Sequence, residues 1–454
     1  MRISVLVSSI SRSTWLIVAV GALTVSSQAT AGGFQITEIC AKCQGLRNAG
    51  AVATTSTAST VFFNPAGMTR LSGSHLEANL HVIIPKFKFD DENSTNAIGG
   101  VPIGKDNDDG GETAYVPSLF FTQEINERWA FGIGVNGPYG LLTEYSDNWI
   151  GRYNAVKSEL ISVNINPSIA YQLDEKFSIG FGFNAIYVDV ELTNALDFGT
   201  LAFLAGVPGV TPSTPAFDGS QKLTGNDWGF GWNVGILYEH SPRTRFGIAF
   251  RPDIDTTLKG DSKIKGNDRL AQIDPAFGSR TLNAKADFTV PGTITFGFHH
   301  ELTDRWAVMA SAIWTHWSTF DELRVRLEEG LPDSVQPENW DNSMRWAIGT
   351  RYQLNDRWTL RAGFEFDESP VDNRDRTPRI PDQDRYWFAF GAGYELSDAF
   401  SFDFAYTYIY IPDYSIKDTE VTTGAAAGVP VGNTLDGQYE GNANIVSAQV
   451  TWKF

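Results

Sequence analysis

The sequence predicts a fourteen-stranded antiparallel transmembrane β-barrel. Aromatic residues make up 13% of the chain and glycine accounts for 43 residues, a composition that suits many strands better than many helices. The final strand, residues 444–454, alternates apolar and polar side chains up to the terminal Phe454. Short and long connections also alternate along the chain, which is typical of barrels with short turns at one end and long loops at the other.

The first 31 residues have the organisation of a signal peptide. Arg2 and Arg12 lie in a basic region, residues 15–25 are apolar, and residues 29–31, Ala-Thr-Ala, form a small-residue cleavage site. The apolar run is shorter than the roughly 20 residues that a helix needs to cross a bilayer. We therefore expect export, with a mature chain that starts at Gly32.

Residues 32–70 differ in composition from the rest of the chain. Small and hydroxyl residues dominate this segment, which closes with Asn64, Pro65 and Ala66. It is too short to build its own core and too apolar for a disordered tail, so a larger structure must hold it. Cys40 and Cys43 are its only cysteines. A local disulfide that pins a turn is expected; a redox motif or half of a metal site is the alternative.

Residues 71–454 form the predicted barrel. One short turn motif occurs in six variants. Each variant has Asn, Asp, Ser or Pro at the bend and an aromatic residue at the start of the next strand. They occupy residues 124–129, 172–177, 239–246, 301–306, 353–358 and 395–400. The predicted strands are 74–89, 113–124, 128–145, 155–173, 176–193, 227–239, 243–264, 281–302, 305–319, 341–354, 357–366, 384–396, 399–416 and 439–454. Long links rich in charge, Gly and Pro fill the other gaps, including residues 194–226, 320–340 and 417–438.

The two faces of these strands favour a membrane barrel. Trp358 and Phe364 lie on one face of a strand, and Arg361 and Glu365 on the other. Such strands place aromatic residues in lipid and charges in a polar lumen, and the aromatics after the short turns would form an interfacial girdle. A soluble β-sandwich is the alternative, but it explains neither the alternation of loop lengths nor the aromatic terminus.

Several other functions have little support in the sequence. The formal charge of −18 argues against nucleic-acid binding. Residues 132–137 match a dinucleotide fingerprint, but Pro138 follows in place of a helix. The acidic stretch 106–109 lacks a later calcium ligand; we expect a solvated loop that could touch lipopolysaccharide through divalent cations. His299, His300 and His316 have no evident catalytic partners. We therefore expect no enzyme, no cofactor and no metal site.

Three stretches resemble the FadL/TodX family of outer-membrane transporters for long-chain fatty acids and other hydrophobic compounds. They are residues 32–34 followed by 64–68 (Asn-Pro-Ala-Gly-Met), residues 225–239, and residues 366–371 together with 380–387 (Ile-Pro-Asp-Gln-Asp-Arg-Tyr-Trp). The resemblance implies that residues 32–70 form a hatch inside the barrel and that Asn64, Pro65 and Ala66 take part in its gating. The Cys40/Cys43 pair is not part of the family pattern.

The resemblance also implies a passive route for the ligand. It would be captured outside, enter an apolar pocket and leave through a lateral opening beside Gly137-Pro138-Tyr139-Gly140. Proline cannot donate to a strand ladder and glycine permits a bend, so a gap in pairing is reasonable there. A plain bulge is the alternative.

The resemblance places the ligand's head group at Arg385, with Tyr386 and Trp387 beside it. A guanidinium offers a carboxylate two parallel donors. An ion pair of Arg385 with Asp382 or Asp384 is the alternative. The second basic position of the family has no clear match in residues 341–345. Neutral hydrocarbons therefore remain alternative ligands, and a general porin or an outer-membrane lipase remain alternative functions.

The expected location is the outer membrane of a Gram-negative cell. There the chain would act as a monomer among lipopolysaccharide and outer-membrane lipids. By resemblance to other such barrels, Phe454 would be the signal that the barrel assembly machinery reads.

Overall fold

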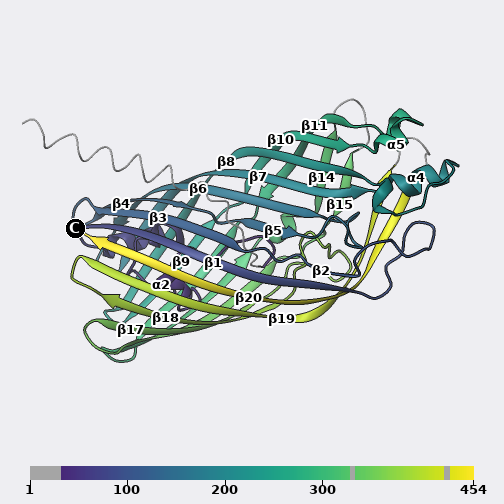
Figure 1. Cartoon of the computed structure of the whole chain (residues 1–454). Helices are drawn as coiled ribbons and strands as arrows, with labels where there is room; N and C mark the ends of the chain where they lie inside the picture. Colours follow the sequence, from purple (N-terminus) through teal and green to yellow (C-terminus); the bar gives the residue numbers. More distant parts are fainter. Residues whose placement is uncertain (1–31, 328–332, 424–429) are drawn as a thin grey trace, which may run out of the picture.

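The structure, a computed structural model, is a closed antiparallel barrel that contains part of its own chain (Figure 1). It describes residues 32–327, 333–423 and 430–454. The predicted signal peptide, residues 1–31, lies outside the described residues. The first and last barrel strands pair from His75↔Lys453 to Asp91↔Gly437, and this pairing closes the wall.

The chain crosses the barrel wall fourteen times within the described residues, which is the predicted number. Each crossing is called a stave here, and three staves are each made of two strands. The staves are β1 (Ser74–Asp91), β3 (Ala114–Glu124), β4 (Trp129–Asn136) with β5 (Gly140–Glu144), β6 (Lys157–Gln172), β7 (Phe177–Leu196), β8 (Gly219–Ser241), β9 (Thr244–Arg251) with β10 (Ile254–Lys265), β11 (Arg280–Val290) with β12 (Thr293–Glu301), β13 (Trp306–Thr315), β16 (Ser343–Gln353), β17 (Trp358–Asp367), β18 (Arg385–Glu395), β19 (Phe400–Thr423) and β20 (Pro430–Lys453).

All six predicted short turns are present and lie at one end of the barrel. Asn355 shows why they form: its Oδ1 accepts hydrogen bonds from the backbone N–H groups of Arg357 (3.0 Å) and Trp358 (2.9 Å). An asparagine side chain that bonds backbone two or three residues onward stabilises a tight bend. The long loops, with α4 (Phe198–Leu204) and α5 (Asp268–Ala271), lie at the opposite end (Figure 1).

The predicted alternation of the faces is confirmed. Trp346 and Ile348 are 53% and 62% exposed on the outside, whereas Arg345, Arg361 and Glu365 are buried inside. The aromatic residues after the turns are between 39% and 47% exposed: Trp129, Phe177, Trp306, Trp358 and Phe400. An outward apolar band with an aromatic girdle and a polar interior is what a lipid bilayer requires of a barrel.

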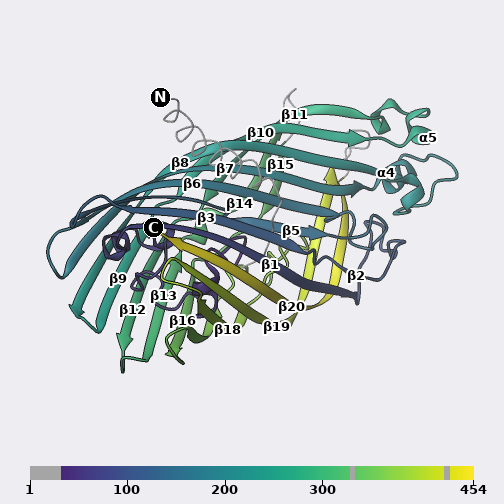
Figure 2. The same ribbon diagram turned by 60° about the vertical axis from the view of Figure 1, so that its left-hand side comes forward.

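The structure differs from the sequence prediction beyond the membrane band. Residues 417–438 were expected to be a link, but β19 continues to Thr423 and β20 begins at Pro430. This long hairpin bends sharply away from the rest of β19 and β20 (Figure 2). It contacts the start of α4, where Asn433 Nδ2 donates to Asp197 Oδ2 at 3.3 Å. β7 and β8 also extend further than expected. Outside the bilayer no strand face needs to be apolar, so these segments lack the alternation that marks a strand.

Smaller elements complete the long-loop end. β2 (Asn107–Asp109) pairs with β1, and β14 (Glu322–Leu327) pairs with both β15 (Ser334–Pro337) and β11. Three short 3₁₀ helices lie in the loops: η2 (Pro215–Phe217), η3 (Pro275–Phe277) and η4 (Trp317–Thr319). Within the part of the chain that the structure describes, no helix is long and apolar enough to cross a membrane.

The terminal residue closes the barrel at the short-turn end. The backbone of Phe454 exchanges hydrogen bonds with Ser74 (2.9 and 3.0 Å), and its ring lies 4.4 Å from that of Trp452 on the outer face. We expect deletion of Phe454 to reduce the folded barrel in the outer membrane severalfold, measured by heat-modifiable mobility in gels. Phe454→Tyr, which keeps an aromatic ring, should restore assembly. Normal amounts of the truncated barrel would contradict this role.

Candidate functional site

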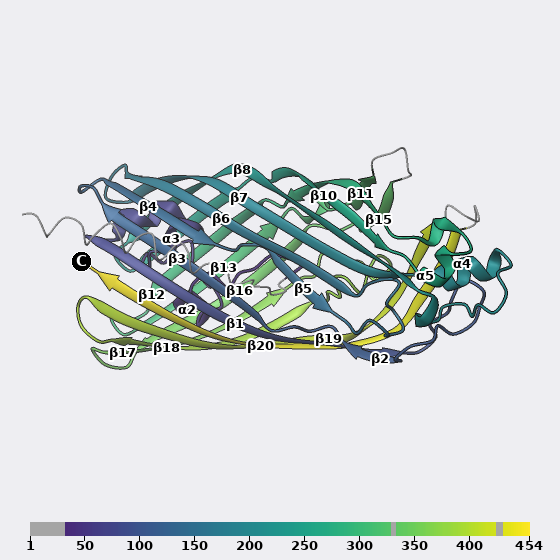
Figure 3. The same ribbon diagram turned by 45° about the horizontal axis from the view of Figure 1, so that its top comes forward.

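Residues 32–70, called the hatch below, lie inside the barrel. Their helical part lies towards the short-turn end, whereas the N–H groups of Gly32 and Gly33 bond Asp367 and Asp382 on the long-loop side. The hatch carries α2 (Ala41–Gln44), α3 (Thr60–Phe63) and η1 (Pro65–Arg70), and Figure 3 shows α2 and α3 among the barrel strands. Polar side chains of the wall hold the backbone of α2. Asn79 Oδ1 accepts from the N–H of Ala41 at 2.9 Å, and Gln449 Oε1 accepts from the N–H of Lys42 at 3.0 Å. The polar lumen thus provides the partners that a segment without its own core needs.

A buried ion-pair network fastens the middle of the hatch to the wall. Arg47 pairs with Glu38 of the hatch (3.3 Å) and with Glu365 of β17 (3.0 Å). Its guanidinium also stacks on the ring of Trp387 in β18, 3.7 Å from the ring centre. Because an unpaired buried charge is costly, removal of Arg47 would leave Glu38 and Glu365 without their common cation in the lumen.

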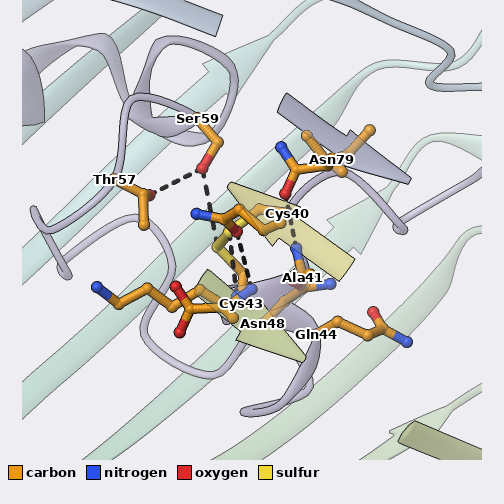
Figure 4. The surroundings of a disulfide bond; sticks show 12 residues. Cys40, Ala41, Cys43, Gln44, Asn48, Thr57, Ser59 and Asn79 are labelled. Carbon is orange, nitrogen blue, oxygen red and sulfur yellow. Dashed lines mark hydrogen bonds between the residues drawn. A yellow bond between two sulfur atoms is a disulfide. The ribbon is translucent and has the colours of Figure 1, made fainter. Parts of the chain in front are cut away.

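The disulfide between Cys40 and Cys43 closes the first turn of α2 (Figure 4). Cys40 is fully buried, and its Sγ accepts a hydrogen bond from the N–H of Cys43 at 3.1 Å. Cys43 Sγ lies 3.9 Å from Ser59 Oγ, which bonds Thr57. The pair thus fixes a local turn of the hatch, as the sequence suggested.

Asn64, Pro65 and Ala66 seat the hatch against β7 and β8. The side chain of Asn64 accepts from the N–H of Ala66 (3.1 Å) and donates to the carbonyl oxygens of Val52 (2.7 Å) and Ile236 (3.0 Å). Two wall glycines leave room for this contact. A Cβ at Gly235 would lie 1.9 Å from Asn64 Oδ1, and one at Gly180 would lie 2.3 Å from the nitrogen of Ala66.

The wall has a break in pairing at the predicted place. β3 pairs with β4 only from Leu119↔Val135 to Glu124↔Ala130, and β5 pairs with β6 on its other side. Among the described residues, no ladder joins residues 114–118 of β3 to β5. The missing pairs begin where Gly137 and Pro138 interrupt the stave.

The start of the hatch occupies this break. The N–H of Ile36 donates to the carbonyl of Pro138, and the N–H of Gly140 donates to the carbonyl of Phe34, both at 2.8 Å. Gln35 and Tyr139 therefore face each other as an antiparallel bridge. The hatch thus acts as a short extra strand that satisfies backbone groups left open by the kink.

Phe34 fills an aromatic cage beside the break. Its ring lies 4.7 Å from Trp317, 5.4 Å from Phe320, 5.6 Å from Trp340 and 6.2 Å from Tyr139. These residues belong to one buried apolar cluster, which Phe34 of the hatch joins to the wall and the loops. In the adjoining loop, burial raises the pKa of Glu338 to about 8, so its carboxyl group is mostly protonated at neutral pH. Glu338 Oε2 accepts a hydrogen bond from Trp340 Nε1 at 3.1 Å.

A cavity of about 80 Å³ lies between the hatch and the wall, directly behind the break. Its lining includes Ile36, Val52, Phe62 and Phe63 of the hatch and Pro138, Tyr139, Arg251 and Arg345 of the wall. Ordinary small-molecule sites measure about 300–1,000 Å³. A long-chain ligand therefore requires the hatch to move.

The structure separates the three residues predicted to bind the head group. Arg385 is buried and paired with Asp382, which also accepts from the N–H of Gly33. Trp387 is buried under Arg47. Tyr386 lies on the opposite face of the strand, 5.3 Å from the ring of Phe366. Tyr386 is therefore not placed to share a luminal ligand with Arg385, and none of the three lines the cavity behind the break.

Sequence reasoning did not assign a role to three arginines that connect the hatch and the wall: Arg47, Arg251 and Arg345. A signal existed for Arg47, since it is one of the few charged residues in a segment that must be buried. Arg251 and Arg345 occupy luminal positions like many others, and alternation alone cannot show which of these meet the hatch. In the described ranges, no cluster of three or more His, Cys, Asp or Glu residues could hold a metal ion.

A closed barrel with lipid-facing aromatics, a luminal hatch and a break in its wall defines an outer-membrane transport barrel. The family model "Outer membrane protein transport protein (OMPP1/FadL/TodX)" matches residues 22–454, so the chain belongs to this family. It is an outer-membrane protein.

Individual relatives match over nearly their whole length. The chain is 32% identical to the long-chain fatty acid transport protein of Salmonella typhi, over 88% of this chain and 92% of that one. It is 28% identical to outer membrane protein P1 of Haemophilus influenzae, over 96% and 98%. The crystal structure of a Pseudomonas aeruginosa FadL homologue superposes with a TM-score of 0.83 at 24% identity, covering 93% and 100%. The Ralstonia pickettii toluene transporter TbuX gives 0.65 at 20% identity, covering 92% and 98%.

Proposed function

We propose that this protein takes up long-chain fatty acids across the outer membrane by passive diffusion, and that they leave through the break in the wall. The observation that carries the proposal is the cavity that lies between the hatch and the break and that Pro138 and Tyr139 help to line. The relative from Salmonella typhi supports the choice of ligand class.

Each part of the route has a physical role. The aromatic cage around Phe34 offers an acyl chain an apolar surface, and chain burial contributes about 0.8 kcal/mol per methylene. Phe34, Gln35 and Ile36 occupy both the cage and the break, so their displacement would open both together. Release would follow rearrangement of the hatch, with Asn64, Pro65 and Ala66 as its seat. No step requires a catalytic group.

Uptake in a host without its own fatty-acid channel tests the proposal. Cells that produce the protein should take up labelled oleate at least tenfold faster than the host alone. Labelled toluene provides the second arm, because structural neighbours of this chain include toluene transporters. Uptake of toluene alone would assign the protein to neutral hydrocarbons, and uptake of neither would refute transport. A large steady conductance of the intact protein in planar bilayers would instead indicate a general porin.

A further inference from the structure

Arg251 differs from three other arginines in or around the hatch because it has no carboxylate partner. Arg47, Arg361 and Arg385 are each in ion-pair contact with an acidic residue. Among the residues that the structure describes, no carboxylate lies within ion-pair distance of Arg251. The ionisable side chain that interacts with it is Tyr139, which carries no charge near neutral pH.

The groups that contact Arg251 are polar but neutral, and Glu365, which also lines the cavity, is paired with Arg47. The guanidinium donates to Asn184 Oδ1 and, at 3.3 Å, to the carbonyl oxygen of Phe62. Asn184 in turn donates to Asn233 Oδ1 at 2.9 Å, and Asn233 also lines the cavity. Amides solvate a cation but do not neutralise it.

Burial makes this arrangement costly. Arg251 is only 9% exposed, and an unpaired buried charge is destabilising unless something compensates it. The side chain lines the cavity behind the break, together with Arg345. Arg345 already donates to Gln35 Oε1 at 2.7 Å and lies 3.9 Å from Asp367 Oδ1. Arg251 is therefore the guanidinium in this cavity that lacks a counter-charge.

We propose that Arg251 binds the head group of the ligand and that this head group is a carboxylate. A carboxylate would supply the missing charge and accept hydrogen bonds from the planar guanidinium. The apolar residues of the same cavity, Phe62, Phe63 and Pro138, would receive the first methylenes of the chain and lead towards the break. This inference rests on the function proposed above and specifies its ligand contact.

Arg251 also contacts the hatch. The test must therefore distinguish a structural role of Arg251 from a role in ligand binding. Its guanidinium lies 4.6 Å from the ring centre of Phe62, in addition to the bond to the Phe62 carbonyl. A purely structural role would affect all ligands alike. Head-group binding would affect only a ligand that carries the carboxylate.

The experiment compares initial uptake of oleate and of oleyl alcohol, which has the same chain without the charge. Arg251→Met should lower the oleate rate about tenfold or more, because a charge-assisted pair is lost, and change the oleyl alcohol rate less than twofold. Arg251→Lys should retain an intermediate oleate rate. Arg243→Met, at an exposed position in the turn before β9, is the matched control and should change neither rate. Rates are corrected for the folded barrel in the outer membrane.

Equal losses for both ligands would overturn the inference and leave Arg251 a structural role. An unchanged oleate rate would also overturn it, as would selective loss of oleate uptake in Arg345→Met or Arg385→Met but not in Arg251→Met. If the wild-type protein transports neither ligand faster than the host, the proposed function itself fails and the inference falls with it. If the wild-type protein takes up oleate but Arg251→Met shows no selective loss of oleate uptake, the inference fails and the proposed function stands.

Discussion

A disulfide between positions 35 and 139 is expected to lower ligand uptake at least tenfold. Gln35 and Tyr139 form the bridge by which the hatch occupies the break, flanked on both sides by 2.8 Å backbone hydrogen bonds. Residues in such a non-hydrogen-bonded antiparallel pair have Cα atoms about 4.5 Å apart, within the range that a disulfide spans. A covalent bond there would keep the hatch in the break and Phe34 in its cage.

The cross-link is best made in a background that lacks the native pair. Cys40→Ser and Cys43→Ser prevent exchange with the new cysteines, and gels without reductant report how completely the new bond forms. Uptake of oleate should be low in the oxidised protein and return after reduction. Each single cysteine variant controls for loss of the original side chain. Equal uptake in the oxidised and reduced states, with complete cross-linking, would show that the ligand leaves by another route.

Much of the barrel could be predicted from sequence because the membrane imposes strict patterns on it. Lipid on one side and a polar lumen on the other force a period of two, which is visible around Trp358 and Arg361. The short turns carry their own chemistry, as Asn355 shows. Beyond the bilayer neither constraint applies. The long hairpin of β19 and β20, expected as a link, shows the consequence.

The site was harder to predict because its contacts join distant parts of the chain. The kink at Pro138 had a local cause and could be located, since proline removes a donor from the ladder. The hatch residue Ile36 bonds the backbone at this kink. This contact depends on the position of residues 32–70 inside the barrel, and no local sequence pattern indicates that position. The sequence did offer Asp382 and Asp384 as partners of Arg385, and the structure shows that Asp382 is the partner. Nothing in the sequence indicated that Arg251 would be buried against Asn184 and the hatch.

The wall and the hatch are stabilised by different sets of interactions. The wall closes through backbone ladders that do not involve the hatch, such as the pairing of β1 with β20. The hatch is held by side-chain contacts, such as those of Arg47 and Asn64, and by the two backbone hydrogen bonds in the break. Because ladders persist when luminal side chains change, the hatch can be released without loss of the barrel. This separation makes a variant that unseats only the hatch possible.

Gly235→Val is expected to unseat the hatch and turn a closed protein into a conducting one. The Cβ would lie 1.9 Å from Asn64 Oδ1 and 3.2 Å from Pro65 Cδ, so the seat of the hatch must shift. Valine suits a strand, and β8 should therefore still form. We expect steady single-channel conductance in planar bilayers and increased entry of small polar solutes, both near zero in the wild type. Gly180→Ala, whose Cβ would lie 2.3 Å from the nitrogen of Ala66, should act in the same direction from β7.

Gly225→Val is the matched control for this effect. It makes the same substitution on the same strand, but its Cβ would meet Leu258 of the wall at 3.3 Å rather than the hatch. It should assemble without added conductance, and wild-type behaviour of Gly235→Val would contradict the seat assigned to Asn64. If Gly235→Val conducts ions and still takes up oleate, the hatch limits leakage more than it limits the ligand. If it conducts ions but loses oleate uptake, the seated hatch is itself part of the binding site, as the lining by Phe62 and Phe63 implies.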